Sequence, residues 1–186
     1  MPTKDKTRGE TLLRLARTAI AQRLGQNATE PTEADWLDQP GAVFVTLTQH
    51  DKLRGCIGSL EARRTLGEDV EVNARAAAFD DPRFPPLTAA ELADTRVEVS
   101  ILSAAEPIQF TDREDALRQF RPGIDGIILE YGPHRATFLP QVWEQLPEPE
   151  QFLAHLMIKA GLPAYYWSEG IRLYRYTVEK FKEGET

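Results

Sequence analysis

One helix-start signal occurs four times along the chain, and it fixes where helices can begin. In each copy a glutamate follows a threonine three residues later: Thr7 with Glu10, Thr65 with Glu68, Thr88 with Glu91, and Thr111 with Glu114. The threonine oxygen accepts a hydrogen bond from an amide of the first turn, while the glutamate carboxylate reaches back to the cap. Together with apolar residues at helical spacing, these signals predict helices at about residues 8–24, 66–79 and 112–120, and a further helix at about 148–160.

Short alternating segments between these helices predict β-strands. Val43, Val45 and Leu47 form one apolar face, and a turn at residues 49–52 leads into a second strand at 53–60. Further strands are predicted at 97–102, at 127–130 and 135–138 as a hairpin, and at 173–178. Hairpins joined by helices are typical of an α+β fold with a mainly antiparallel sheet and flanking helices.

The composition excludes several classes of protein. A net charge of −7 and a pI of about 5.1 give no general attraction for phosphate backbones, so nucleic-acid binding is not expected. The apolar runs are too short for a membrane span, and the N-terminus lacks a secretory pattern. The single cysteine fits a reducing compartment. We therefore expect a cytoplasmic protein. The three histidines have no metal-ligand spacing, and no metal site is expected.

The segment 53–59 carries the single thiol of the chain between two glycines. As a strand it would place Leu53 and Ile57 on the core face, and Arg54, Cys56 and Gly58 on the other face. A nearby guanidinium lowers a thiol pKa, and glycines such as Gly55 admit a ligand, which makes Cys56 a candidate nucleophile or redox residue. The alternative is that Cys56 is a small core residue and that the glycines relieve crowding against the alanine-rich helix. Both interpretations remain open at this point.

A second unusual stretch, residues 80–86, combines two carboxylates and a guanidinium on a loop stiffened by prolines. Such loops commonly carry binding groups, so Asp81 and Arg83 are candidate ligand-binding residues, unless they only form a local ion pair that fixes the loop. Glu98 and Ser100 share the polar face of strand 97–102, and they would line the same surface as Arg54 and Cys56 if the strands are neighbours. The alternative is a face that is solvated or covered by a helix.

Several stretches resemble one known family in the same order along the chain. LRGCIGS at residues 53–59 looks like the LRGCIGT signature of the AMMECR-type family, also called AmmeMemoRadiSam system protein A. AAFDDPRFPPLTAAEL at 77–92 with VEVSIL at 97–102, and ATFLPQVWEQL at 136–146 with LMIKAGLP at 156–163, agree with the same family. The resemblance covers about residues 41–181, and Ser59 keeps the hydroxyl of the threonine that is common there.

The resemblance carries expectations about fold, partners and site. It implies an α+β fold of two unequal subdomains with a cleft between them, here a single AMMECR-like domain over residues 1–186. It also implies a partnership with a Memo-like protein and a radical S-adenosylmethionine enzyme. This chain has no CxxxCxxC motif, so the iron–sulfur chemistry would belong to the partner and no cofactor is expected here. The family's candidate functional surface corresponds to Arg54, Gly55, Cys56, Gly58, Asp81 and Arg83.

Three hypotheses for the function follow. The first is an accessory component of that three-protein system, which binds a small-molecule ligand or a reaction intermediate near Arg54 and Cys56. The second is an enzyme that uses Cys56 as a nucleophile or redox thiol. The third is an interaction or regulatory module without catalysis.

Overall fold

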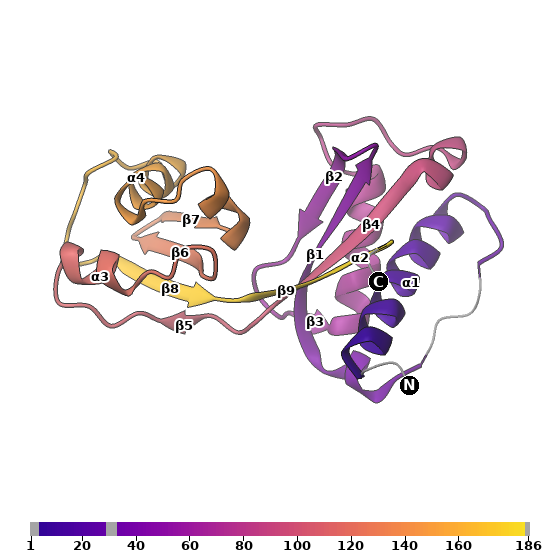
Figure 1. Cartoon of the computed structure of the whole chain (residues 1–186), viewed down its shortest axis with the longest axis horizontal. Helices are drawn as coiled ribbons and strands as arrows, with labels where there is room; N and C mark the ends of the chain where they lie inside the picture. The colour runs from indigo at the N-terminus through magenta and orange to yellow at the C-terminus, as the bar shows by residue number, and fades with distance from the viewer. Residues whose placement is uncertain (1–3, 29–32, 185–186) are drawn as a thin grey trace. The chain divides into compact units, whose positions relative to one another are not determined.

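The computed structural model describes residues 4–28 and 33–184, and the chain divides into two compact units. The first unit runs up to Leu102 and also takes in the chain from Glu179 onward, and the second is Ser103–Val178. Each unit holds its own β-sheet with helices packed against it (Figure 1). The predicted α+β class with antiparallel pairing and flanking helices is confirmed, although the strands form two sheets.

The sheet of the first unit has the strand order β2-β1-β4-β9, and the short β3 pairs with β1. β1 is its central strand, because it pairs antiparallel with β2, β3 and β4. The elements of this unit are α1 (Lys4–Arg23), a 3₁₀ turn η1 (Asp35–Asp38), β1 (Pro40–Gln49), β2 (Lys52–Gly58), β3 (Arg64–Thr65), α2 (Leu66–Phe79), a second 3₁₀ segment η2 (Ala89–Asp94), β4 (Thr95–Leu102) and β9 (Val178–Lys182).

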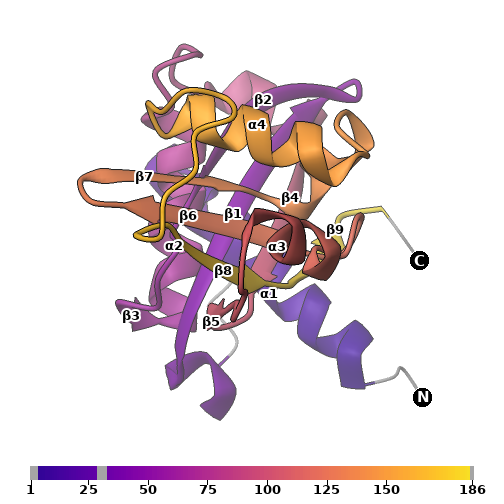
Figure 2. The same ribbon diagram turned by 90° about the vertical axis from the view of Figure 1, so that its left-hand side faces the viewer.

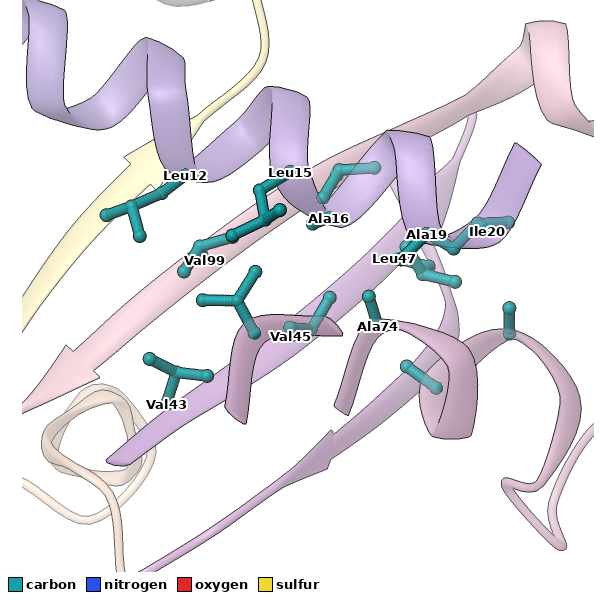
Figure 3. Close-up of a cluster of buried hydrophobic side chains, with 14 of the residues drawn as sticks. Leu12, Leu15, Ala16, Ala19, Ile20, Val43, Val45, Leu47, Ala74 and Val99 are labelled. Atoms are coloured by element: carbon teal, nitrogen blue, oxygen red, sulfur yellow. The ribbon is translucent and has the colours of Figure 1, made fainter. Parts of the chain in front are cut away.

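Helices α1 and α2 pack against the same face of this sheet and bury its apolar side chains (Figure 3). Val43, Val45 and Leu47 of β1 have no exposed surface, and they meet Leu12 and Ile20 of α1. Because side chains alternate along a strand, every second residue of β1 points away from this core. The opposite face of the sheet therefore carries the alternate side chains of β1, among them Thr46 and Thr48.

The second unit is built around a four-stranded antiparallel sheet in the order β5-β8-β6-β7. Helix α4 lies against this sheet (Figure 2), and Phe152 of α4 stacks on Trp143 with ring centroids 3.8 Å apart. The elements are β5 (Glu106–Pro107), α3 (Arg113–Gln119), β6 (Gly126–Tyr131), β7 (His134–Phe138), a 3₁₀ turn η3 (Pro140–Glu144), α4 (Pro149–Lys159) and β8 (Arg172–Tyr176).

The helix-start signals are confirmed at two of their four positions. Thr65 and Glu68 exchange reciprocal hydrogen bonds at the start of α2, and the Thr88 amide donates to Glu91 at the start of η2. The helix start predicted from Thr7 is wrong, because α1 already begins at Lys4. The signal at Thr111 is displaced by one residue: Asp112, a stronger N-cap than threonine, caps α3 by accepting from the Asp115 amide.

The last predicted strand, 173–178, is wrong in its extent. The chain breaks at Thr177 into β8 and β9, and these strands belong to different sheets. β9 contains two apolar residues, Val178 and Phe181, and Phe181 packs against the core. Two apolar residues three positions apart do not form the alternating pattern from which a strand is predicted. None of the helices within residues 4–28 and 33–184 has both the length and the apolar character needed to cross a membrane.

The alternation along the β1–β2 hairpin can be tested with two leucines. Leu47 is completely buried, whereas Leu53, across the same hairpin, is 44% exposed. We expect Leu47→Ala to lower the free energy of unfolding by about 2–5 kcal/mol, because it leaves a cavity between the sheet and the helices. Leu53→Ala, the matched control, should stay within about 0.5 kcal/mol of the parent. Urea unfolding followed by circular dichroism measures both, and equal losses would contradict this register.

Candidate functional site

A β-bulge in β2 decides which way the side chains of segment 53–59 point. The register pairs Leu47 with Gly55 but Thr48 with Leu53, so Arg54 is an extra residue with no partner in β1. A bulge of this kind interrupts the alternation of the strand. The expectation that Leu53 faces the core is therefore wrong, and Leu53 is exposed.

Arg54 is not the guanidinium that acts on Cys56. Its side chain is buried, donates from Nη2 to the Pro85 carbonyl at 2.8 Å, and forms an ion pair with Glu91 at 3.3 Å. Its guanidinium also lies 5.8 Å from the ring centroid of Phe84. Arg54 therefore joins the bulge of β2 to the loop that follows α2, which is a positioning role.

Glu91 completes this brace. The backbone hydrogen bond from Thr88, followed by the bond from Arg54, lowers the pKa of Glu91 to about 2. One carboxylate thus caps η2 and pairs with the buried arginine. Sequence reasoning identified Glu91 only as a capping residue, because nothing in the local pattern shows that Arg54 reaches it.

The two glycines of the segment have packing roles in this structure. A Cβ at Gly55 would collide with the backbone carbonyl of Ala77 in α2, and a Cβ at Gly58 would collide with the ring of Phe44 in β1. The interpretation that glycine relieves crowding against α2 accounts for Gly55, and cross-strand packing accounts for Gly58. Binding of a ligand at Gly55 or Gly58 stays a prediction.

Cys56 lies in a row of side chains on the sheet face opposite α1 and α2. The register places Cys56 beside Thr46 of β1, and Thr46 beside Glu98 of β4. The Cys56 Sγ and Thr46 Oγ1 atoms are 3.2 Å apart, within hydrogen-bond distance. Ser100, which pairs with Phe44, lies one repeat further along the same face and is buried. β1 thus separates the strands of Cys56 and Glu98, but their side chains share one surface.

The electrostatic environment does not make Cys56 a thiolate. Burial raises the pKa of the thiol, and this outweighs the lowering by the Thr46 hydroxyl and by the positive charge of Arg83. A protonated thiol is a poor nucleophile at neutral pH. The hydrogen-bond partner of the sulfur is a hydroxyl, which is not a base.

Asp81 and Arg83 cap the free edge of β2 at Cys56. β2 is an edge strand, and the Cys56 amide donates to Asp81 Oδ2 at 3.0 Å. Arg83 Nη2 lies 3.5 Å from the Cys56 carbonyl oxygen, at the limit for a hydrogen bond. The loop therefore takes up backbone groups that an additional strand would otherwise use.

The Asp81–Arg83 pair is tightly organised. Arg83 donates to the carboxylate from Nε at 3.0 Å, from Nη2 at 2.8 Å and from its backbone amide at 3.0 Å. These bonds, together with the Cys56 amide, hold the pKa of Asp81 well below its usual range. The Asp81 side chain is 2% exposed while that of Arg83 is 55% exposed, so the pair presents a fixed guanidinium to solvent.

Ser59 ends the segment with a partly buried hydrogen-bond network. Its hydroxyl donates to Asp69 at 2.8 Å and accepts from the Asn73 amide at 3.0 Å. The other oxygen of Asp69 accepts from the Val43 amide at 2.8 Å. This network fastens the end of β2 to α2, which explains why a hydroxyl is useful at this position.

The described residues contain no group of three or more histidine, cysteine, aspartate or glutamate side chains placed to hold a metal ion. The side chains that the fold does bring together are Cys56, Thr46, Glu98, Asp81 and Arg83. Thr46 was missed by sequence reasoning. Its position in the alternation of β1, opposite the apolar Val45 and Leu47, could have revealed it.

Comparison with known proteins gives one consistent result. The family described as AMMECR1 matches residues 13–181. Protein MJ0810 of Methanocaldococcus jannaschii is 40% identical over 95% of this chain and 90% of its own, and a protein of Thermococcus onnurineus is 41% identical over 94% and 90%. The crystal structure of an uncharacterized protein from Pyrococcus horikoshii, PH0010, is similar with a TM-score of 0.84, 38% identity and coverage of 95% and 91% of the two chains.

The hydrogen bonds that Arg83 and the Cys56 amide donate to Asp81 predict a pH-dependent contribution to stability. Because the folded pKa of Asp81 is depressed, its stabilisation is complete above the unfolded value of about 3.9 and is lost as the pH falls further. We expect Asp81→Asn to be less stable than the parent at pH 7, and the difference to shrink below about pH 4. Urea unfolding at several pH values measures this.

Asp80→Asn is the matched control, because Asp80 is exposed and next in sequence. It should change stability little at pH 7. A difference between Asp81→Asn and the parent that stayed constant down to the acid limit would show that the carboxylate is not held ionised by these bonds.

Proposed function

The chain belongs to the AMMECR1 family, and we propose that it is a cytoplasmic accessory protein that binds a small polar ligand on the Cys56 face of its first sheet. The single observation that carries this proposal is the exposed Arg83 guanidinium, which Asp81 holds fixed beside Cys56. A cation fixed by its own carboxylate needs no rearrangement to accept a hydrogen-bonding ligand. The Glu98 carboxylate and the Thr46 hydroxyl add acceptor and donor groups on the same face.

Binding is favoured over catalysis by the state of the thiol. A nucleophilic cysteine needs a lowered pKa or an adjacent base, and Cys56 has a raised pKa and a hydroxyl neighbour. The enzyme that uses Cys56 as nucleophile or redox thiol is therefore the second candidate. Cys56 still belongs to the ligand-binding surface as a weakly polar contact.

The proposal also includes two partners, a Memo-like protein and a radical S-adenosylmethionine enzyme. Support for them comes from the resemblance of segments 53–59, 77–92 and 136–146 to the AmmeMemoRadiSam system protein A pattern. Under this proposal the chain presents a ligand or intermediate to the radical enzyme, which supplies the iron–sulfur chemistry.

Association of the three proteins tests the partner part. The full chain and both partners from the same organism are purified and examined by sedimentation velocity, singly and mixed. A faster-sedimenting species that contains this chain is expected. A mixture that sediments as three separate proteins, or a genome that encodes neither partner, would remove this part of the proposal.

Alkylation of Cys56 distinguishes the binding protein from the enzyme. Because the thiol pKa is raised, iodoacetamide should label the folded chain at pH 7 more slowly than the unfolded chain in guanidinium chloride, and the labelling rate of the folded chain should keep rising with pH after that of the unfolded chain has levelled off. Mass spectrometry of quenched samples gives both rates. Labelling of the folded chain at pH 7 that is faster than that of the unfolded chain would favour the enzyme.

A further inference from the structure

A hollow of about 320 Å³ lies on the first sheet, beside the row that contains Cys56. Within β1 and β4 the register pairs Thr48 with Arg96 and Thr46 with Glu98, so the four side chains share the face opposite α1 and α2. β9 is the neighbour of β4 in the sheet (Figure 1), and its residue Lys182 also lines the hollow. The side chains that line the hollow include those of Thr48, Asp51, Arg96, Glu98, Lys182 and Glu183.

Two of the carboxylates around this hollow already have cationic partners. Glu183 forms an ion pair with Arg17 at 3.0 Å and accepts a hydrogen bond from the Val97 amide at 3.0 Å. Glu98 lies 3.9 Å from the ammonium group of Lys180. Neither Arg17 nor Lys180 lines the hollow, so these carboxylates are neutralised from outside it.

Among the charged groups that line the hollow, Asp51 forms no ion pair in the described part of the chain, and neither does Arg96. In residues 4–28 and 33–184 its guanidinium has no ion pair and no hydrogen bond, although Arg17, Arg54, Arg64 and Arg83 of the same unit each pair with a carboxylate. Arg96 is exposed and lines the hollow together with the ammonium of Lys182. A protein with net charge −7 thus leaves an uncompensated guanidinium in a concave site.

The position of Thr48 indicates what such a guanidinium binds. Thr48 is the direct cross-strand neighbour of Arg96, and side chains in such pairs have Cβ atoms roughly 5 Å apart. A guanidinium fork with a hydroxyl beside it suits the oxygens of a carboxylate or a phosphate, to which arginine donates two parallel hydrogen bonds. We infer that this hollow binds the oxyanion group of a small molecule, with Arg96 as the anion-binding residue.

This inference rests on the proposed function, because it names the ligand class for the same sheet face. Glu98 is one strand repeat from Arg96, roughly 6.6 Å along β4, and Thr46 and Cys56 continue the row across the sheet. A molecule whose oxyanion is held by Arg96 therefore extends its remaining atoms over Glu98 and towards Cys56 and Arg83. The ligand is a small carboxylate or phosphate compound, not a neutral one.

The test uses the ¹⁵N-labelled full chain and three simple probes at constant ionic strength: butyrate, inorganic phosphate, and butyramide as the uncharged match of butyrate. Amide chemical shifts of Thr48, Val97 and Glu98 are followed during each titration. Saturable shifts with butyrate or phosphate are expected, and which of the two binds more tightly identifies the oxyanion. Butyramide should leave these amides unchanged. Equal responses to butyrate and butyramide, or no saturable response to either anion, would overturn the inference.

Variants assign the binding to Arg96. Arg96→Gln should weaken anion binding roughly tenfold or more, because it removes charge-assisted hydrogen bonds. Arg96→Lys keeps the charge but not the fork and should fall between Arg96→Gln and the parent. Arg63→Gln, an exposed arginine that pairs with Glu61 and does not line the hollow, is the control and should bind as the parent does. Unchanged binding in Arg96→Gln would contradict the role of Arg96.

The outcome is separable from the proposed function. If the anion titrations fail while the chain still associates with its partners, only the ligand class is wrong. If the anions bind at Arg96 but no partner associates, the inference about this hollow stands and the partner part of the proposed function fails.

Discussion

The hydrogen bond from the Cys56 amide to the Asp81 carboxylate is the contact on which the candidate site depends. β2 is an edge strand, and without this bond its outward amide at Cys56 would be left without a partner from the protein. The carboxylate comes from the loop after α2, so one bond fixes that loop to the sheet. Arg83 then satisfies the remaining lone pairs of Asp81 and is itself held in place. An unpaired carboxylate that is 2% exposed would be costly, and the guanidinium removes this cost.

This arrangement separates the residues of the segment into two kinds. Arg54, Gly55, Gly58 and Ser59 maintain the geometry: Arg54 braces the loop through Glu91, the glycines permit close packing, and Ser59 joins the Asp69 network. Cys56 and Arg83 face outward from that framework. Phe84 connects both kinds, since the guanidinium groups of Arg54 and Arg83 lie 5.8 Å and 5.5 Å from its ring centroid. A short sequence signature can therefore reflect the support of a site as much as its chemistry.

Elements with strong local signals were predictable from the sequence. The bounds of α2 follow from the Thr65–Glu68 capping box and from the proline after Asp81, and the β1–β2 hairpin follows from its alternation. The bulge at Arg54 was not predictable, because a single extra residue leaves no mark in the pattern but reverses the faces of Leu53 and Arg54. The same holds for the pairing of Cys56 with Asp81 and of Arg54 with Glu91, which join residues 25 and 37 positions apart. Sequence named Cys56, Asp81 and Arg83, while only the fold shows that they meet.

Hydrogen–deuterium exchange of the Cys56 amide, measured by ¹⁵N NMR on the full chain, tests this account most directly. We expect a protected amide in the parent and loss of that protection in Asp81→Ala. The amide of Ile57, the next residue of β2, points to the opposite side of the strand and towards β1, and it should remain protected in both proteins. A Cys56 amide that exchanges in the parent as fast as an unstructured amide would contradict the claim that Asp81 holds the edge of β2.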